Sequence, residues 1–174
     1  VGSEMCIRDR SLPADTKFDI YIVDGGSTDG TVESVKTQFP HVNIKTVDGV
    51  FWNRGMIEAW KMAEEKKRNG CNYDYYLWLN DDTFIYKDCI ASLLRVSLLK
   101  KNRTIVLGST VDTQTRSKLT YGGRDKTGKV ARPSSDDSPV PVIMMNGNIV
   151  LVPHSVYKKL GTLDPYYTCL LYTS

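Results

Sequence analysis

The stretch Phe18–Thr31, FDIYIVDGGSTDGT, decides the fold class. It opens with the apolar, β-rich run Phe18–Val23 and changes at once to a polar turn rich in glycine. A continuous apolar run suits a strand that is buried on both faces, as in a parallel sheet. A helical pattern follows, opened by Asp29-Gly30. The stretch therefore predicts a strand, a tight turn and a helix, which open a βαβ unit.

The same alternation of strands and helices continues along the chain. Further strands are predicted at 42–47, 75–79, 104–107, 119–123, 129–130, 142–145 and 148–152, and helices at 31–39, 56–67, 86–99 and 154–160. A polar, proline-bearing loop is expected at 132–141. This order predicts an α/β fold, with helices on both faces of one mostly parallel sheet and no domain boundary.

The composition is that of a soluble globular protein. The 174 residues suffice for one domain with a hydrophobic core, and 41% hydrophobic content excludes a disordered chain. The net charge of +3 is spread over mixed acidic and basic residues, which argues against a nucleic-acid-binding protein. No stretch approaches the ~20 apolar residues of a membrane span, and the first residues lack the apolar centre of a secretory signal. We expect a cytoplasmic protein, for which peripheral association with the inner face of the membrane stays open.

The four cysteines show no metal-binding pattern. Cys6, Cys71, Cys89 and Cys169 have no CxxC spacing and no histidine at a zinc-like spacing. We therefore expect reduced, structural thiols in a reducing compartment.

Both ends of the chain look foreign to the fold. Residues 1–10, VGSEMCIRDR, and residues 169–174, CLLYTS, join no hydrophobic pattern. Both strings resemble translated sequencing-adaptor sequence, and we expect non-native tails around a domain of residues 11–168. Ordinary floppy termini are the alternative.

Asp24 ends the first predicted strand, and ligands bind at the carboxyl ends of the strands in open parallel sheets. An acidic side chain there can accept hydrogen bonds from a nucleobase or a ribose. The stretch lacks GxGxxG spacing and a P-loop lysine, so a dinucleotide or triphosphate fold is not supported. The alternative is a capped strand-to-helix turn without a ligand, with Ser27 or Asp29 as the N-cap.

Asn80, Asp81 and Asp82 follow the predicted strand YYLWL directly. Two carboxylates and an amide supply the oxygen ligands that suit Mg²⁺ or Mn²⁺. Such a cation would neutralise a diphosphate leaving group. A solvated loop before the next helix is the alternative. We favour a shared site, because both acidic clusters occur at equivalent ends of one predicted sheet.

Four stretches in order resemble the family 2 glycosyltransferases, whose nucleotide-sugar-binding fold is called GT-A. They are FDIYIVDGGSTDGT, FWNRGMIEAWKMA, YLWLNDDTFI with the family's DxD element, and MNGNIVLVPHSVYKKLGTLDPYY. They cover nearly everything from about Phe18 to Tyr167. The form Asn80-x-Asp82 is similar to the rhamnosyltransferase-like branch.

The resemblance implies a role for each matching residue on the nucleotide side. Asp24, with Gly26 and Ser27 in the same turn, would contact the nucleoside. Arg54 would lie near the diphosphate; a surface cation at a helix start is the alternative.

It implies further roles on the sugar side. Asp82 would be the principal metal ligand, while Asn80 and Asp81 contact the ribose, the metal or the donor sugar. Asn146 and Gly147 would line the donor-sugar and acceptor side, which is compatible with a simple β-turn there.

The chain also departs from the family pattern. Family members begin with a strand and a helix ahead of Phe18, and they place a catalytic Asp or Glu past the LDPYY segment. The resemblance therefore implies an incomplete GT-A domain without its first strand and C-terminal part. The catalytic base is expected beyond Tyr167, so this chain is expected to bind donor weakly and to transfer no sugar.

The function implied is that of an inverting glycosyltransferase, which moves a sugar from a nucleotide-diphosphate donor to a hydroxyl of a glycan or lipid-linked acceptor. Surface polysaccharide synthesis is the expected setting, by resemblance to the branch. A nucleotidyltransferase and a non-catalytic nucleotide-sugar-binding homologue are the alternatives. The sequence does not specify the sugar, the nucleotide, the linkage or the oligomeric state.

Overall fold

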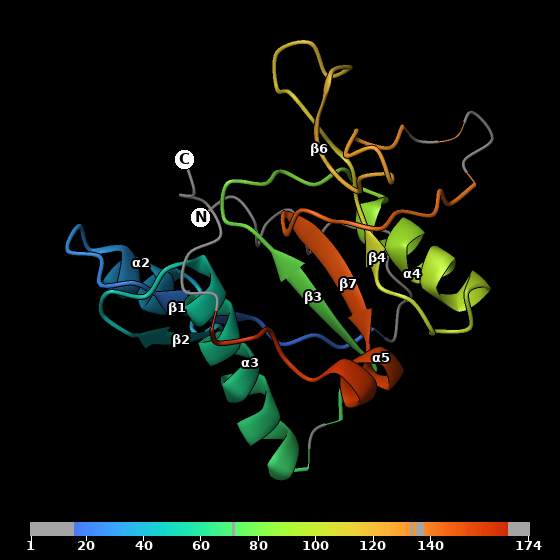
Figure 1. The fold of residues 1–174 in the computed structure, drawn as a ribbon. Coiled ribbons are helices and arrows are strands. Elements are labelled where there is room, and N and C mark those ends of the chain that lie inside the picture. Colours follow the sequence, from blue (N-terminus) through green and yellow to red (C-terminus); the bar gives the residue numbers. More distant parts are fainter. Residues whose placement is uncertain (1–15, 71, 133, 135–137, 167–174) are drawn as a thin grey trace. The chain divides into compact units, whose positions relative to one another are not determined.

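The computed structural model describes residues 16–70, 72–132, 134 and 138–166 (Figure 1). With these gaps, the chain divides into two compact units. One comprises residues 16–73 and 160–166, and the other comprises residues 74–159. The expected tails at 1–10 and 169–174 lie outside the described residues, as do Cys6, Cys71 and Cys169. Cys89, the first residue of the helix at Cys89–Leu99, is half-buried.

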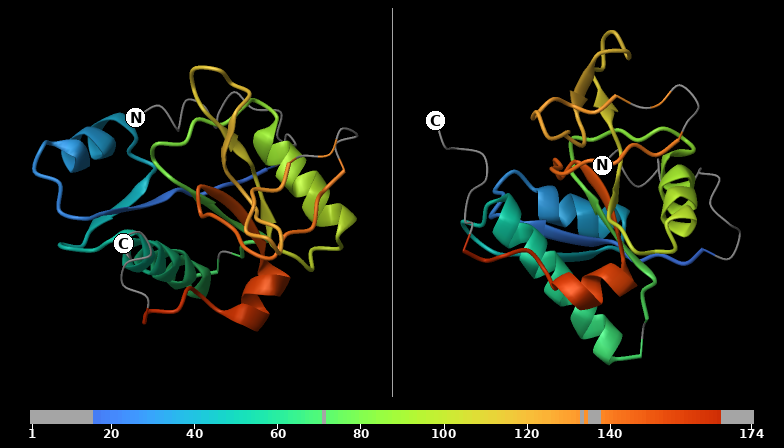
Figure 2. Two further views of the ribbon diagram at one scale, coloured as in Figure 1. Left: turned by 45° about the horizontal axis from the view of Figure 1, so that its top comes forward. Right: turned by 45° about the vertical axis from the view of Figure 1, so that its right-hand side comes forward.

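The first unit is built on one parallel strand pair. Its elements are β1 (Tyr21–Asp24), α2 (Thr31–Gln38), β2 (Asn43–Thr46) and α3 (Trp52–Arg68). β1 and β2 pair in parallel, and α2 connects them along the chain. This confirms the βαβ unit expected from the opening stretch. α3 packs against β1 and α2 packs against β2 (Figure 2). α3 buries Ile57, Trp60 and Ala63, one turn apart, as an amphipathic helix does.

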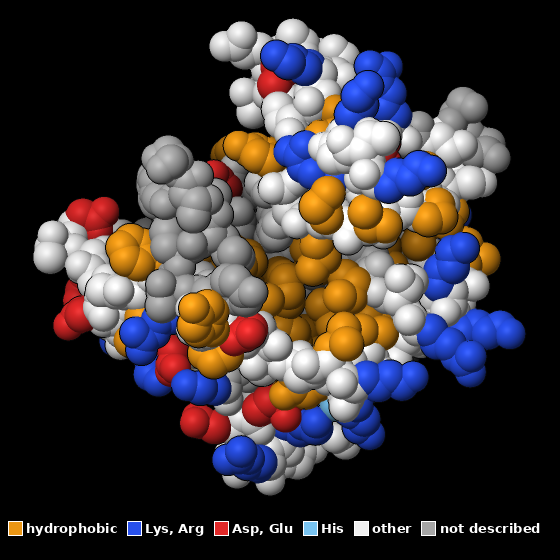
Figure 3. Space-filling model, viewed as in Figure 1, with side chains coloured by type: hydrophobic (Ala, Val, Ile, Leu, Met, Phe, Trp, Pro, Cys, Tyr) orange, Lys and Arg blue, Asp and Glu red, His pale blue; other side chains and the backbone are white. Residues whose placement is uncertain are grey.

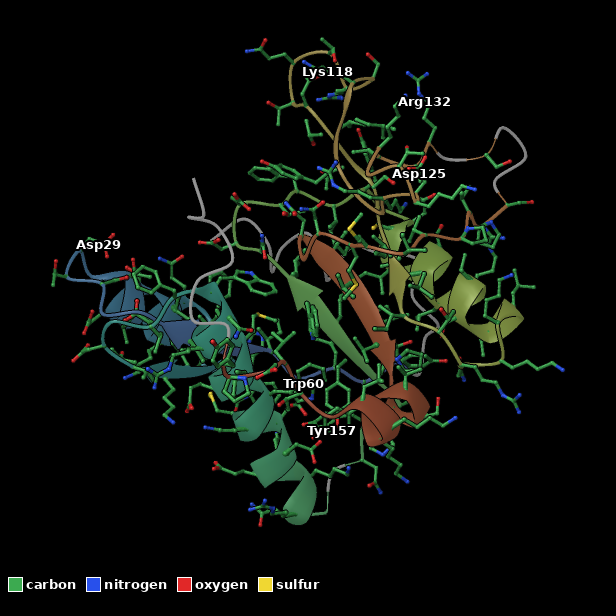
Figure 4. All side chains as sticks on the ribbon, in the orientation of Figure 1. Asp29, Trp60, Lys118, Asp125, Arg132 and Tyr157 are labelled. Atoms are coloured by element: carbon green, nitrogen blue, oxygen red, sulfur yellow. The ribbon has the colours of Figure 1, made fainter. Side chains whose placement is uncertain are left out.

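The helix after β1 begins with a glycine rather than with a capping side chain. Gly30 is the N-cap residue of α2 with φ of 84°, and no side chain caps the helix. The N-cap at Ser27 or Asp29 that belongs to the alternative of a capped turn is therefore not found. Asp29 lies on the loop before α2, where its carboxylate accepts bonds from the amide and hydroxyl of Thr31 at 3.1 and 2.6 Å (Figure 4). Glycine suits this left-handed junction because it has no Cβ.

The second unit is built on a three-stranded sheet with the order β3-β7-β4 (Figure 1). Its elements are β3 (Tyr75–Leu79), α4 (Cys89–Leu99), β4 (Val106–Leu107), β5 (Thr110–Val111), β6 (Leu119–Tyr121), β7 (Ile149–Pro153) and α5 (His154–Leu160). β7 is antiparallel to both of its neighbours. The described strands form three separate sheets, in which only β1 and β2 pair in parallel, so the prediction of one mostly parallel sheet was wrong for them.

The direction of β7 follows from its connection. The described residues of 108–148, here called the arm, leave the carboxyl end of β4 and return to the same edge, where the Gly108 amide donates to the Ile149 carbonyl at 3.1 Å. A strand that starts beside the ends of its neighbours must run back against them. The burial of all five residues of β7 is also what a parallel strand would show. A central strand is covered on both faces whichever way its neighbours run.

The core of the second unit lies between α4 and the sheet. Leu93, Val106, Ile149 and Leu151 are its buried centre, each at most 7% exposed. Half-buried apolar side chains of β3 and α4 surround them. Tyr76 of β3 packs on the ring of Tyr157 in α5, with centroids 4.9 Å apart.

The arm is a small antiparallel structure of its own. β5, which was not predicted, pairs with β6, and Arg124 bridges both Val130 and Met144. The strands predicted at 129–130 and 142–145 are thus isolated bridges. A Cβ at Gly123 would lie 2.6 Å from Val142, so only glycine permits this approach between the two halves of the arm. No helix within the described ranges is long and apolar enough to cross a membrane.

Candidate functional site

Asp24 ends β1, and its carboxylate is bonded to the turn that follows. The side chain is buried, at 6% exposure, and it accepts bonds from the amides of Gly26 and Ser27 at 3.0 and 3.1 Å. A hydrogen bond from the Ser27 side chain, aided by these amides and by Thr46, holds the pKa of Asp24 below its ordinary value, although burial opposes this. Asp24 is therefore ionised and fixes the shape of the turn.

This charge should make the stability of the first unit depend on pH. Because the folded-state pKa of Asp24 lies below the ordinary value of 3.8, its contribution is complete above 3.8 and is lost as the pH falls through the folded value. Asp24→Asn should lower the urea midpoint at neutral pH, and the difference from the wild type should shrink in acid. Urea unfolding of the wild type and of Asp24→Asn, from neutral pH into acid, measures this difference between their midpoints. A difference that stays constant with pH would show that the charge of Asp24 does not stabilise the first unit.

The turn after β1 is held against the turn after β2. The Gly49 amide donates to the Gly25 carbonyl at 3.1 Å. A Cβ at Gly25 would lie 3.1 Å from the Val50 carbonyl oxygen, and one at Gly26, where φ is 104°, would lie 3.0 Å from Asp48 Oδ1. The paired glycines therefore let the two turns meet, and they leave the Gly26 backbone exposed.

Asp48 is a further candidate site residue, and it was not predicted from the sequence. Its carboxylate is exposed, and it follows β2 just as Asp24 ends β1. The signal was the tripeptide Val-Asp-Gly, which occurs at 23–25 and again at 47–49. Because the carboxyl ends of neighbouring parallel strands meet at one edge, this repetition places a second acid at the same corner.

Arg54 lies exposed in the first turn of α3. That turn has no acidic residue and no side-chain cap, so the helix N-terminus and the guanidinium both favour an anion. The turn is fixed in place by Asn53, which is 2% exposed and donates to the Asp164 carbonyl at 2.9 Å. Val50 precedes α3 and lies close to Gly55 of that helix: a Cβ built at Gly55 would be 4.0 Å from Val50 Cγ2. The carbonyl oxygen of Val50 lies beside Gly25 in the turn after β1.

Asn80, Asp81 and Asp82 form a turn at the carboxyl end of β3. The Asn80 amide donates to the Asn148 carbonyl at 3.0 Å, and the Thr83 amide donates to the Asn80 carbonyl at 3.1 Å. Both carboxylates are exposed, and a long 3.4 Å contact joins the Thr83 hydroxyl to Asp82. Their oxygens are therefore accessible to a ligand.

The donor set of this turn fits a hard divalent cation. Among the residues that the structure describes, no three His, Cys, Asp or Glu side chains gather into a metal-binding group. Mg²⁺ is commonly bound through one or two carboxylates together with substrate phosphates. Asp81, Asp82 and the amide of Asn80 match that arrangement, with phosphate oxygens completing the shell.

Asn146 and Gly147 lie just before β7, at the edge where β3 ends. The bond between Asn80 and Asn148 brings this segment beside the acidic turn. Asn146 Oδ1 is buried and accepts no hydrogen bond from any described residue. A buried acceptor without a donor is costly, so a ligand hydroxyl could satisfy it.

The structure thus brings the predicted residues together in two groups, one in each unit. The first group is Asp24, Gly26, Ser27 and Arg54, and the second is Asn80, Asp81, Asp82, Asn146 and Gly147. β1 and β3 belong to separate sheets, and a site shared by the two groups stays a prediction.

The comparison with protein families identifies the family of the chain. The family model described as Glycosyl transferase family 2 matches residues 7–148, from before β1 to the start of β7. Such enzymes have the α/β fold GT-A and bind a nucleotide-sugar donor and an acceptor. A search of curated proteins found no match, and neither did a search of solved structures. Because the family model spans most of its length, the chain belongs to glycosyl transferase family 2.

Proposed function

We propose that this chain holds the donor in an inverting sugar transfer from a nucleotide diphosphate to an acceptor hydroxyl, in the synthesis of a surface polysaccharide. The observation that carries the proposal is the exposed carboxylate pair Asp81–Asp82 at the carboxyl end of β3, in a family that uses nucleotide sugars. Both the position at a strand end and the type of side chain suit a phosphate-bound cation.

On the nucleoside side, the turn after β1 would bind the base and the ribose. The carboxylate of Asp24 is largely engaged by hydrogen bonds from its own turn. We therefore assign Asp24 to positioning that turn as well as to contact with the nucleoside. The exposed backbone of Gly26 and Ser27 and the carboxylate of Asp48 supply the polar groups that a nucleoside would meet.

On the diphosphate side, Arg54 and the N-terminus of α3 offer positive charge. Asp82, with Asp81 and Asn80, would hold a Mg²⁺ or Mn²⁺ ion. When bound, that ion would offset the charge that develops on the departing diphosphate.

On the sugar side, Asn146 and Gly147 would line the donor sugar and the approach of the acceptor. The unpaired Asn146 oxygen supports this role, because sugar hydroxyls are donors of the matching kind. Asn80 in place of a first acidic residue supports membership of the rhamnosyltransferase-like branch.

The chemistry would be a single displacement at the anomeric carbon. The acceptor oxygen forms the new bond on the face opposite the diphosphate, its proton passes to an acidic general base, and the nucleotide diphosphate leaves with the bonding electrons. We assign the base to none of the described residues.

Donor binding can be measured directly by calorimetry of the chain with a panel of nucleotide sugars and the matching nucleoside triphosphates, in Mg²⁺ and in EDTA. We expect one nucleotide sugar to bind in Mg²⁺ and to bind less tightly in EDTA. Tighter binding of a triphosphate would favour a nucleotidyltransferase instead. Binding of neither class would sink the proposal.

A further inference from the structure

The positive charge of this chain is concentrated in one segment. Residues 108–132, the first part of the arm, contain six Lys and Arg against two Asp, a net charge of +4. The whole chain carries +3, so all other residues together carry −1. Two more acidic residues of the sequence 108–148, Asp136 and Asp137, lie outside the described residues.

Most of these cations project into solvent. Five of them are exposed, namely Arg116, Lys118, Lys126, Lys129 and Arg132. Figure 4 shows Lys118 and Arg132 on the outer part of the arm. The ion pairs found within the described residues involve other lysines, in β2 and α3.

The two aspartates of this segment, already subtracted in its net charge of +4, are each engaged by their own turn. Asp112 accepts bonds from the amides of Gln114 and Thr115 at 2.9 and 2.7 Å. Asp125 accepts bonds from the amide and the hydroxyl of Thr127 at 2.7 and 2.6 Å. The carboxylates shape the two turns that present the cations.

The second part of the arm exposes a run of apolar side chains. Val140 is 42% exposed, Ile143 69%, Met144 47% and Met145 40%. Tyr121 of β6 adds a ring at 49%. Large apolar side chains that gather on a surface in this way indicate an interaction site.

Backbone hydrogen bonds hold the apolar run beside the basic segment. The Arg124 amide donates to the Met144 carbonyl at 2.8 Å, and the Ile143 amide donates to the Arg124 carbonyl at 3.0 Å. On the face shown in Figure 3, hydrophobic side chains lie among Lys and Arg side chains over the upper part of the molecule. The arm therefore presents both kinds of side chain on one small structure.

We infer that the arm docks this chain onto an anionic lipid bilayer. Exposed lysines and arginines attract the headgroups, while Ile143 and the neighbouring methionines enter the boundary between headgroups and acyl chains. The centre of a protein–protein interface is poor in lysine, which fits this surface less well. Nucleic acid would gain little from exposed aliphatic side chains. The inference does not rest on sugar transfer and would stand if the donor proposal failed.

The test is sedimentation of the full chain with vesicles of phosphatidylglycerol and phosphatidylcholine in equal parts, against vesicles of phosphatidylcholine alone. Each Lys or Arg near such a bilayer strengthens binding by about fivefold. The triple variant Lys118→Gln, Lys126→Gln, Lys129→Gln should therefore bind the anionic vesicles about 100-fold more weakly. Added salt should weaken the wild type in the same direction.

A matched triple variant controls for net charge. Lys100→Gln, Lys158→Gln and Lys159→Gln remove three exposed lysines from the same unit and should leave vesicle binding unchanged. Ile143→Ser should weaken binding about tenfold by removing one inserted side chain. Equal binding to both kinds of vesicle, an equal loss in the control, or no effect of Ile143→Ser would each overturn the inference. The inference would also be overturned if the chain forms a dimer without lipid and the arm variants convert this dimer to a monomer. That result would show that a second copy of the chain is the partner of the arm.

Discussion

Asp82→Asn is expected to weaken binding of the nucleotide sugar by about 10- to 100-fold in Mg²⁺ while leaving binding in EDTA unchanged. The carboxylate is exposed and at most weakly engaged by the Thr83 hydroxyl, so its charge is available to a cation. The amide keeps the size of the side chain and one oxygen but loses the negative charge. The difference between the two conditions isolates the part of the affinity that depends on the cation.

Asp88→Asn is the matched control for this variant. Asp88 is also exposed, and it precedes α4 without making a side-chain cap to that helix. It should bind donor as the wild type does in both conditions. If Asp82→Asn loses as much affinity in EDTA as in Mg²⁺, Asp82 acts through the shape of its turn and is not a metal ligand.

Leu151→Ala is expected to lower the free energy of unfolding by about 2–5 kcal/mol. Leu151 is 2% exposed in β7, at the centre of the core of the second unit, and truncation would leave a cavity between the sheet and α4. β7 also pairs with both β3 and β4, so its loss of packing reaches every strand of the sheet. Urea unfolding, followed by tryptophan fluorescence, measures the change.

Leu98→Ala makes the same chemical change on the surface. Leu98 lies in α4 and is 62% exposed, so its truncation should alter the free energy of unfolding by about 0.5 kcal/mol or less. Similar losses in the two variants would contradict the assignment of the core to the face between α4 and β7.

The local parts of this fold were predictable because they depend on side chains close together in the sequence. FDIYIV followed by glycines fixed β1 and its turn, and the apolar stripe of α3 fixed its buried face. The corner after β3 was equally visible, since YYLWL meets Asn80-Asp81-Asp82 without an intervening residue. The family resemblance rested on the same stretches, and the family model confirmed it.

The partner groups of the site were less accessible to sequence reasoning. Asp48 was overlooked, although its Val-Asp-Gly repeats the motif of Asp24 and the expected βαβ unit already implied that the two strands pair in parallel. The bond between Asn80 and Asn148 joins residues far apart in the chain. This bond forms only because β7 lies beside β3 in the sheet.

The sequence by itself determined most of the longer strands and helices, where the acidic turns fall and which family the chain resembles, because these follow from local pattern. Only the tertiary structure decided that β7 runs antiparallel between β3 and β4 and that the arm brings exposed cations beside apolar side chains. Each of these depends on long-range backbone pairing or on the direction from which a connection returns. A strand buried on both faces has the same composition in either direction.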